Sequence, residues 1–152
     1  MNPGEQKTSV VIERIYAQFT HLRVEKNTTS YSGCFEAAFE MKYGDVYCHF
    51  RQQRKGVINN IPYILGAFGH VCNSLGLPPL CCLVVYKKTG QCSEGVITSK
   101  EVPEKERPEF AEKVDRLATY ACNDYPQPGT QKAQDFLNLV LQHLREKGMA
   151  ME

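Results

Sequence analysis

Residues 59–90 read NNIPYILGAFGHVCNSLGLPPLCCLVVYKKTG, and this stretch carries the strongest structural signals of the chain. Apolar residues recur at three- and four-residue spacing as far as Gly76, which predicts an amphipathic helix that ends there. The proline pair 78–79 forbids any further helix. The almost continuous apolar run 80–86 is typical of a strand buried on both faces, and the glycine-containing end of the block predicts a turn.

The sequence on either side of this block predicts further helices and a hairpin. Helical periodicity appears at 8–19, 108–121 and 132–146, with Thr130 as a cap of the last helix. The apolar face of the third helix comprises Phe110, Val114, Leu117, Ala118 and Ala121. Alternating apolar and polar residues predict strands at 34–41 and 45–50, and residues 95–98 predict a short partner strand.

These elements together predict a single α+β domain with a small antiparallel sheet and flanking helices. Its parts are an α+β core (8–98), a charged loop rich in proline (99–109) and a helical C-terminal part (110–148). The centre, a helix followed by a strand and a glycine-bearing turn, predicts an arrangement similar to a winged helix.

The composition narrows the classes of function. The 152 residues are 42% hydrophobic, and 18 Lys and Arg face 17 Asp and Glu, so the net charge of +1 does not suit a polyanion binder that works by bulk charge. No apolar run approaches the roughly 20 residues of a membrane span. The N-terminus lacks the features of a secretory signal, and we therefore expect a cytoplasmic protein that does not enter a membrane.

Seven cysteines form neither a complete disulfide framework nor a zinc motif. The count is odd, so full pairing within the chain is impossible, and no C-x-x-C spacing occurs. We expect several of them to be small buried apolar residues of an intracellular protein. The sequence predicts no metal and no cofactor.

The block from Ile61 to Gly95 resembles small uncharacterised proteins of bacteria and their mobile elements. Their pattern is GLPPL, two variable residues, LVV and a K-x-TG turn, and it matches here from Gly76 to Gly90. Family members often continue with a Pro-Gly pair, whereas this chain has Gln91 and Cys92. The resemblance implies an accessory role in a phage or plasmid and implies no chemistry.

A more distant similarity is to the winged-helix domain of DNA alkyltransferases and their catalytically silent relatives. Their acceptor cysteine stands in a P-C-H-R-V block, whereas Cys81 and Cys82 are followed by Leu83 and Val84, with neither His nor Arg. The resemblance therefore implies the fold without the alkyl transfer.

Local basic residues support nucleic-acid binding without catalysis. Five candidate phosphate contacts stand before the central helix or at its start, and two stand in the turn after the buried strand. They are Arg51, Arg54, Lys55, Asn59, Asn60, Lys87 and Lys88. A helix N-terminus adds backbone N–H groups that favour phosphate. We expect the partner to be nucleic acid or a protein bound to it, and the hypothesis requires the two basic clusters to share one concave face.

Two enzymatic alternatives remain open. Glu36, Glu40 and Lys42 contain an E-x-K triplet on a predicted strand, which resembles the arrangement of Mg²⁺-dependent nucleases. Cys81 or Cys82 would serve a thiol enzyme if a neighbour lowered a thiol pKa of about 8.5.

A third alternative is a protein-interaction module. Tyr120, Tyr125 and Pro126, around the C-terminal loop, would offer it an aromatic surface. The sequence leaves the oligomeric state open.

Overall fold

The computed structural model describes residues 7–40 and 57–149, without the side chains of 57–60. The described chain is mostly helical with one two-stranded sheet, which agrees with α+β only loosely. The elements, in chain order, are α1 (Thr8–Glu25), β1 (Thr29–Ser30), α2 (Tyr31–Phe39), α4 (Val57–Ser74), the 3₁₀ turn η2 (Leu80–Leu83), β2 (Val84–Val85), the 3₁₀ turn η3 (Glu104–Glu106), α5 (Arg107–Phe110), the π-helical η4 (Ala111–Asp115), α6 (Arg116–Ala121) and α7 (Gln131–Glu146).

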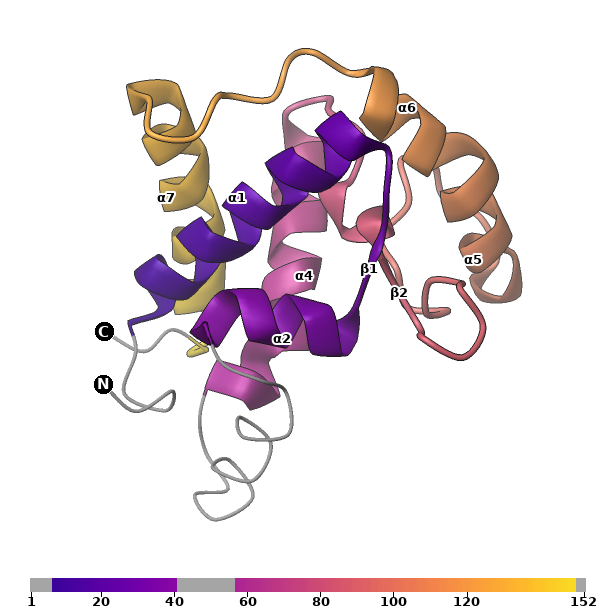
Figure 1. Cartoon of the computed structure of the whole chain (residues 1–152), viewed down its shortest axis with the longest axis horizontal. Helices are drawn as coiled ribbons and strands as arrows, with labels where there is room; N and C mark the ends of the chain where they lie inside the picture. Colours follow the sequence, from indigo (N-terminus) through magenta and orange to yellow (C-terminus); the bar gives the residue numbers. More distant parts are fainter. Residues whose placement is uncertain (1–6, 41–56, 150–152) are drawn as a thin grey trace.

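Helix α4 runs through the centre of the molecule, where α7 packs against it and α1 meets it through aromatic side chains, while α2 packs against α1 (Figure 1). The core between these helices is aromatic. The ring of Phe68 on α4 meets Phe19 edge to face at 5.3 Å, and Tyr16 lies 5.3 Å from Phe136 of α7. The inward stripes of three helices therefore converge on one hydrophobic cluster, as their periodicity predicts.

Three predicted helices are present with extended bounds. Helix α1 continues past Phe19 to Glu25 because Leu22 is also buried. Helix α4 ends before Gly76, whose φ of 72° suits glycine. Thr130 caps α7 as predicted, since its hydroxyl accepts a hydrogen bond from the Ala133 N–H at 3.2 Å.

The strand predicted at 34–41 is wrong, because residues 31–39 form helix α2. The Ser30 hydroxyl caps this helix by accepting from the Gly33 N–H at 3.1 Å. The buried side chains Cys34, Phe35, Ala38 and Phe39 follow a helical spacing rather than the alternation of a strand. The second predicted strand, 45–50, lies outside the described residues.

The strand predicted at 80–86 is also largely wrong. Only β2 is extended, and residues 80–83 form a buried 3₁₀ turn after the two prolines. β2 pairs in parallel with β1, with Ser30 opposite Val85, and residues 95–98 form no strand. Within 7–40 and 57–149 there is therefore neither an antiparallel sheet nor the wing of a winged helix.

The third predicted helix exists, but its apolar face points the other way from that of α7. Segments α5, η4 and α6 form one helix of residues 107–121, which we call the edge helix because it lies at the side of the molecule opposite α7 (Figure 1). Val114 and Leu117 on it are exposed, whereas Asp115, Arg116 and Thr119 are buried. In the part of the chain that the structure describes, no helix has the length and apolar character to cross a membrane.

Candidate functional site

Lys87 and Lys88 lie in a tight turn that follows β2. The Gly90 N–H donates to the Tyr86 carbonyl at 2.7 Å, and the Tyr86 N–H donates to the Gln91 carbonyl at 2.8 Å, which closes the turn. Gly90 adopts a φ of 68°, a conformation that glycine accepts without a steric cost. Both lysines are exposed, and within residues 7–40 and 57–149 neither forms an ion pair. The predicted turn is confirmed, and it presents two cations to solvent.

An aromatic pair lies beside this turn. Because Ser30 pairs with Val85 in the parallel sheet, the next residues, Tyr31 and Tyr86, come together with ring centroids 5.3 Å apart. Tyr86 is 48% exposed, whereas Tyr31 is half-buried. Burial raises the pKa of the Tyr31 hydroxyl, against the opposing effect of its hydrogen bond with Ser93. An exposed ring, held by its neighbour, therefore adjoins the two lysines.

Tyr31 also lines a pocket of about 210 Å³ between α4 and the loop that follows the lysine turn. Pro62, Leu65 and Gly66 of α4 form one wall, and Ser93 and Gly95 belong to the loop. A Cβ at Gly66 would meet no atom within 4 Å, so the glycine leaves this wall open. The N-terminal half of α4 thus faces the loop 93–97, which follows the lysine turn in the chain.

A second glycine of α4 lets this loop approach closely. A Cβ at Gly69 would lie 2.7 Å from the Cβ of Ile97, closer than side chains tolerate. The thiol of Cys81, which lies next to Gly69, donates to the Ile97 carbonyl at 3.6 Å and holds the same loop. Residue 97 is therefore fixed both by packing and by a hydrogen bond.

The other predicted phosphate contacts are only partly placed. Arg51, Arg54 and Lys55 lie outside the described residues. Helix α4 begins at Val57, so Asn59 and Asn60 stand inside its first turn and not at its cap. The structure places the lysine turn beside the Tyr31–Tyr86 pair and places the loop after that turn against the first half of α4, while the convergence of the two basic clusters stays a prediction.

The residues proposed for a nuclease do not share a strand. Glu36 is on helix α2, and Glu40 ends it in a left-handed conformation with a φ of 55°. The Glu40 carboxylate lies 3.5 Å from the Arg14 guanidinium, and Lys42 falls outside the described ranges. No group of three or more His, Cys, Asp or Glu in residues 7–40 and 57–149 is arranged to hold a metal ion.

The two candidate nucleophilic cysteines are buried in the core. Burial raises the pKa of Cys82 to about 12, and it raises the pKa of Cys81 well above its usual range. The Cys82 sulfur lies 3.4 Å from the Thr119 hydroxyl. Reactive thiols need a lowered pKa and access to solvent, so these two side chains act as packing residues.

The aromatic surface predicted after the third helix is not formed as expected. Tyr125 is buried, its hydroxyl donates to the Pro78 carbonyl, and the Arg23 guanidinium lies 4.2 Å from the centre of its ring. The Tyr120 hydroxyl donates to the Asn27 carbonyl at 2.9 Å. Both tyrosines therefore anchor the C-terminal part onto α1 and its neighbours.

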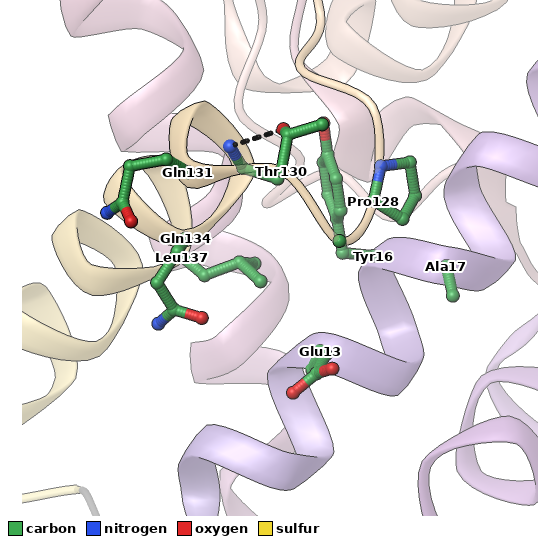
Figure 2. A pocket seen from close by; sticks show the side chains of 10 residues that line it. Glu13, Tyr16, Ala17, Pro128, Thr130, Gln131, Gln134 and Leu137 are labelled. Carbon is green, nitrogen blue, oxygen red and sulfur yellow. Dashed lines mark hydrogen bonds between the residues drawn. The ribbon is translucent and has the colours of Figure 1, made fainter.

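A larger pocket, of about 330 Å³, lies between α1 and the start of α7 (Figure 2). Figure 2 shows Glu13 on the α1 side and Gln131 and Gln134 on the α7 side, with Thr130 hydrogen-bonded at the helix start. Its described lining contains a carboxylate and no cationic side chain, which does not suit a phosphate. This pocket therefore does not compete with the lysine turn as a nucleic-acid site.

The sequence analysis named Lys87 and Lys88 as candidate site residues and did not name Tyr31 or Tyr86. Tyr86 ends the apolar run and directly precedes the two lysines, so an aromatic residue next to cations was visible in the sequence, although its exposure was not. Tyr31 had no such signal, because its position depends on a parallel pairing across more than fifty residues. No protein-family model, no curated protein and no solved structure is similar enough to this chain to count as a match.

Proposed function

We propose that this protein binds nucleic acid, with no catalysis assigned to it. Lys87 and Lys88 would contact phosphates beside the ring of Tyr86, and Arg51, Arg54 and Lys55, which precede α4 in the sequence, would supply further phosphate contacts. The observation that carries the proposal is the half-exposed ring of Tyr86, held by Tyr31 directly beside two lysines without an ion pair in the described part of the chain.

This combination suits a single strand better than a duplex. Unpaired bases stack on aromatic side chains, and each such stack contributes about 1–3 kcal/mol without requiring a particular sequence. Lysine ammonium groups contact the phosphates between the bases. With about five cations available, binding would be of modest affinity and strongly dependent on salt.

The enzymatic alternatives have weaker support. The thiols of Cys81 and Cys82 are buried with raised pKa values, and Glu40 faces Arg14. The resemblance of the Ile61–Gly95 block to mobile-element proteins supports an accessory role in the cytoplasm, in a phage or plasmid context, where a nucleic-acid ligand would be at hand.

Fluorescence anisotropy with a labelled oligothymidylate and a matched duplex tests the proposal. At low salt the double variant Lys87→Ala/Lys88→Ala should bind about tenfold more weakly, and the slope of log affinity against log salt should fall by about two. The control, Lys132→Ala/Lys147→Ala, removes two exposed charges from the ends of α7 and should bind like the wild type.

Variants of the aromatic ring separate stacking from charge. Tyr86→Leu should weaken binding to the single strand, whereas Tyr86→Phe should preserve it, because only the first removes the ring. Absence of binding by the wild type at low salt would reject the proposal, and so would equal losses in the two double-lysine variants.

A further inference from the structure

The edge helix exposes a continuous apolar stripe. Val114 is 45% and Leu117 is 62% exposed, and Ala118 and Ala121 are exposed on the same side. A single exposed apolar residue is ordinary on a protein surface, but four on one side of the last two turns of a helix are typical of an interaction site. The nucleic-acid proposal makes no use of this face.

The opposite side of the edge helix explains why the stripe cannot turn inward. The buried Asp115 carboxylate accepts hydrogen bonds from the Ser99 N–H at 3.0 Å and from the Ser99 hydroxyl at 2.5 Å. The Arg116 Nε donates to the Cys82 carbonyl at 3.2 Å. Rotating the helix to bury Leu117 would break these bonds, and buried polar groups without partners cost about 1–3 kcal/mol each.

A groove runs beside the stripe and offers a receptor for a side chain. It has a volume of about 320 Å³ and lies between the edge helix and the segment that follows α4. Leu77 and Pro78 form one wall, and Val114 and Ala118 form the other. Asn73, Ser99 and Asp115 also line the groove, and the Asp115 carboxylate is already hydrogen-bonded to Ser99. Because Ala118 has only a methyl group, the groove has room for an aliphatic side chain from outside.

We propose that this face is the interface of a homodimer, in which the edge helices of two copies pair antiparallel about a two-fold axis. The order of large and small side chains along the stripe favours a second copy of this chain as the partner. With the axis between positions 117 and 118, Leu117 of each copy lies opposite Ala118 of the other, and Val114 lies opposite Ala121. Large residues therefore meet small ones on both sides, which is the self-complementarity that an isologous interface requires.

The same register brings Leu117 of the second copy to the groove beside Ala118. The helix ends at Ala121, where Cys122 is extended, so the stretch that pairs is 114–121. Its charged residues are Asp115 and Arg116, and both are buried on the opposite side. An isologous pairing of this stretch thus fills the groove without opposing two charges of the same sign.

Sedimentation equilibrium of the full chain, from about 1 μM to about 1 mM, tests the proposal across moderate and weak affinities. The wild type should form a dimer, and Leu117→Glu should raise its dissociation constant at least a hundredfold, because the change occurs twice in each dimer. Leu139→Glu on α7, where the wild-type leucine is 42% exposed, is the matched control and should leave the dimer intact.

Circular dichroism establishes that each variant is folded, and Ala118→Glu replaces Leu117→Glu if the latter does not fold. A wild type that stays monomeric throughout the range overturns the proposal, whatever other protein it binds. A dimer that survives the substitution in the stripe overturns it as well.

Cross-linking tests the register. In a Cys122→Ser background, a mixture of Val114→Cys and Ala121→Cys chains should form a disulfide-linked heterodimer on mild oxidation. Each variant alone should link much less. Preferential linking of Val114→Cys to itself would indicate a parallel pairing and contradict the proposed interface. Neither result depends on nucleic-acid binding.

Discussion

Helix α7 and the edge helix have similar sequence patterns but opposite orientations. The apolar stripe of α7 is buried in full; it comprises Ala133, Phe136, Leu137, Val140, Leu141 and Leu144. The edge helix instead buries Asp115, Arg116 and Thr119, and it exposes Val114 and Leu117. The side of a helix that faces the core is therefore not determined by its apolar residues alone.

The difference lies in what each helix packs against. Helix α7 meets the aromatic side chains of α1 and α4, which accept only apolar neighbours without a desolvation cost. The edge helix meets loops whose backbone groups need partners, including the Cys82 carbonyl and the Ser99 N–H. Since buried polar groups are almost always hydrogen-bonded, these loops select the polar side of the helix.

The largest expected effect concerns the apolar contact of α7. Phe136→Ala should lower the free energy of unfolding by about 3–5 kcal/mol, because it removes a buried ring that lies 5.3 Å from Tyr16 and 6.1 Å from Phe68. Urea denaturation measures the change. A loss below about 1 kcal/mol would mean that α7 is not anchored by its aromatic contacts.

The buried Asp115 of the edge helix should contribute somewhat less to the free energy of unfolding. Asp115→Ala should lower the free energy of unfolding by about 2 kcal/mol, since it removes two hydrogen bonds to a charged, buried acceptor. Asp124→Ala, at an exposed position beyond the helix, serves as the control and should change stability by less than about 0.5 kcal/mol. Equal effects of the two substitutions would remove the proposed reason for the orientation of the edge helix.

Acid should lower the stability of the protein through His143, on the partly exposed side of α7. Partial burial, with the nearby His70 and Lys147, lowers the pKa of His143, and Glu146 opposes this effect. A lowered pKa in the folded state means that protonation favours unfolding, so stability is complete above about pH 6.5 and falls as the pH drops through the folded-state pKa. His143→Gln should therefore reduce the loss of stability measured between about pH 7.5 and about pH 5.5. An unchanged loss would exclude His143 as its source.

The smallest effect is expected on the exposed stripe. In dilute, monomeric protein, Leu117→Ala should change the free energy of unfolding by less than about 0.5 kcal/mol, because the side chain contributes little to the packed core. Leu137→Ala, the same substitution at a buried position of α7, should cost about 2–5 kcal/mol. Similar losses at the two positions would show that Leu117 is buried in the monomer.

Local signals in the sequence were enough for α1, α4, the edge helix and α7, and for the lysine turn, but not for α2. Gly76, Gly90 and Thr130 mark ends that depend on a few neighbouring residues, and all three behave as predicted. Segment 34–41 was misread because Glu36 and Glu40 alternate with apolar residues, although Ser30 caps a helix there. The prediction rested on the alternation within 34–41 and treated the polar residues before it only as a loop. It therefore overlooked Ser30 as a helix cap.

Features that depend on distant contacts could not be predicted. The parallel pairing of β1 with β2 joins segments that are far apart in the chain, and this pairing brings Tyr31 next to Tyr86. The orientation of the edge helix likewise depends on Ser99 and Cys82, outside that helix. Of the proposed nucleic-acid site, the sequence therefore supplied the charges and not the aromatic pair.

The most direct test of the central claim is the rate of thiol labelling at two positions of the edge helix, Leu117→Cys and Ala111→Cys, in a Cys122→Ser background. At concentrations where the protein is monomeric, Leu117→Cys should react at nearly the rate of a free thiol. Ala111→Cys, at a position that is fully buried, should be protected by orders of magnitude. Equal rates, or protection of Leu117→Cys, would contradict a helix held with its polar side inward.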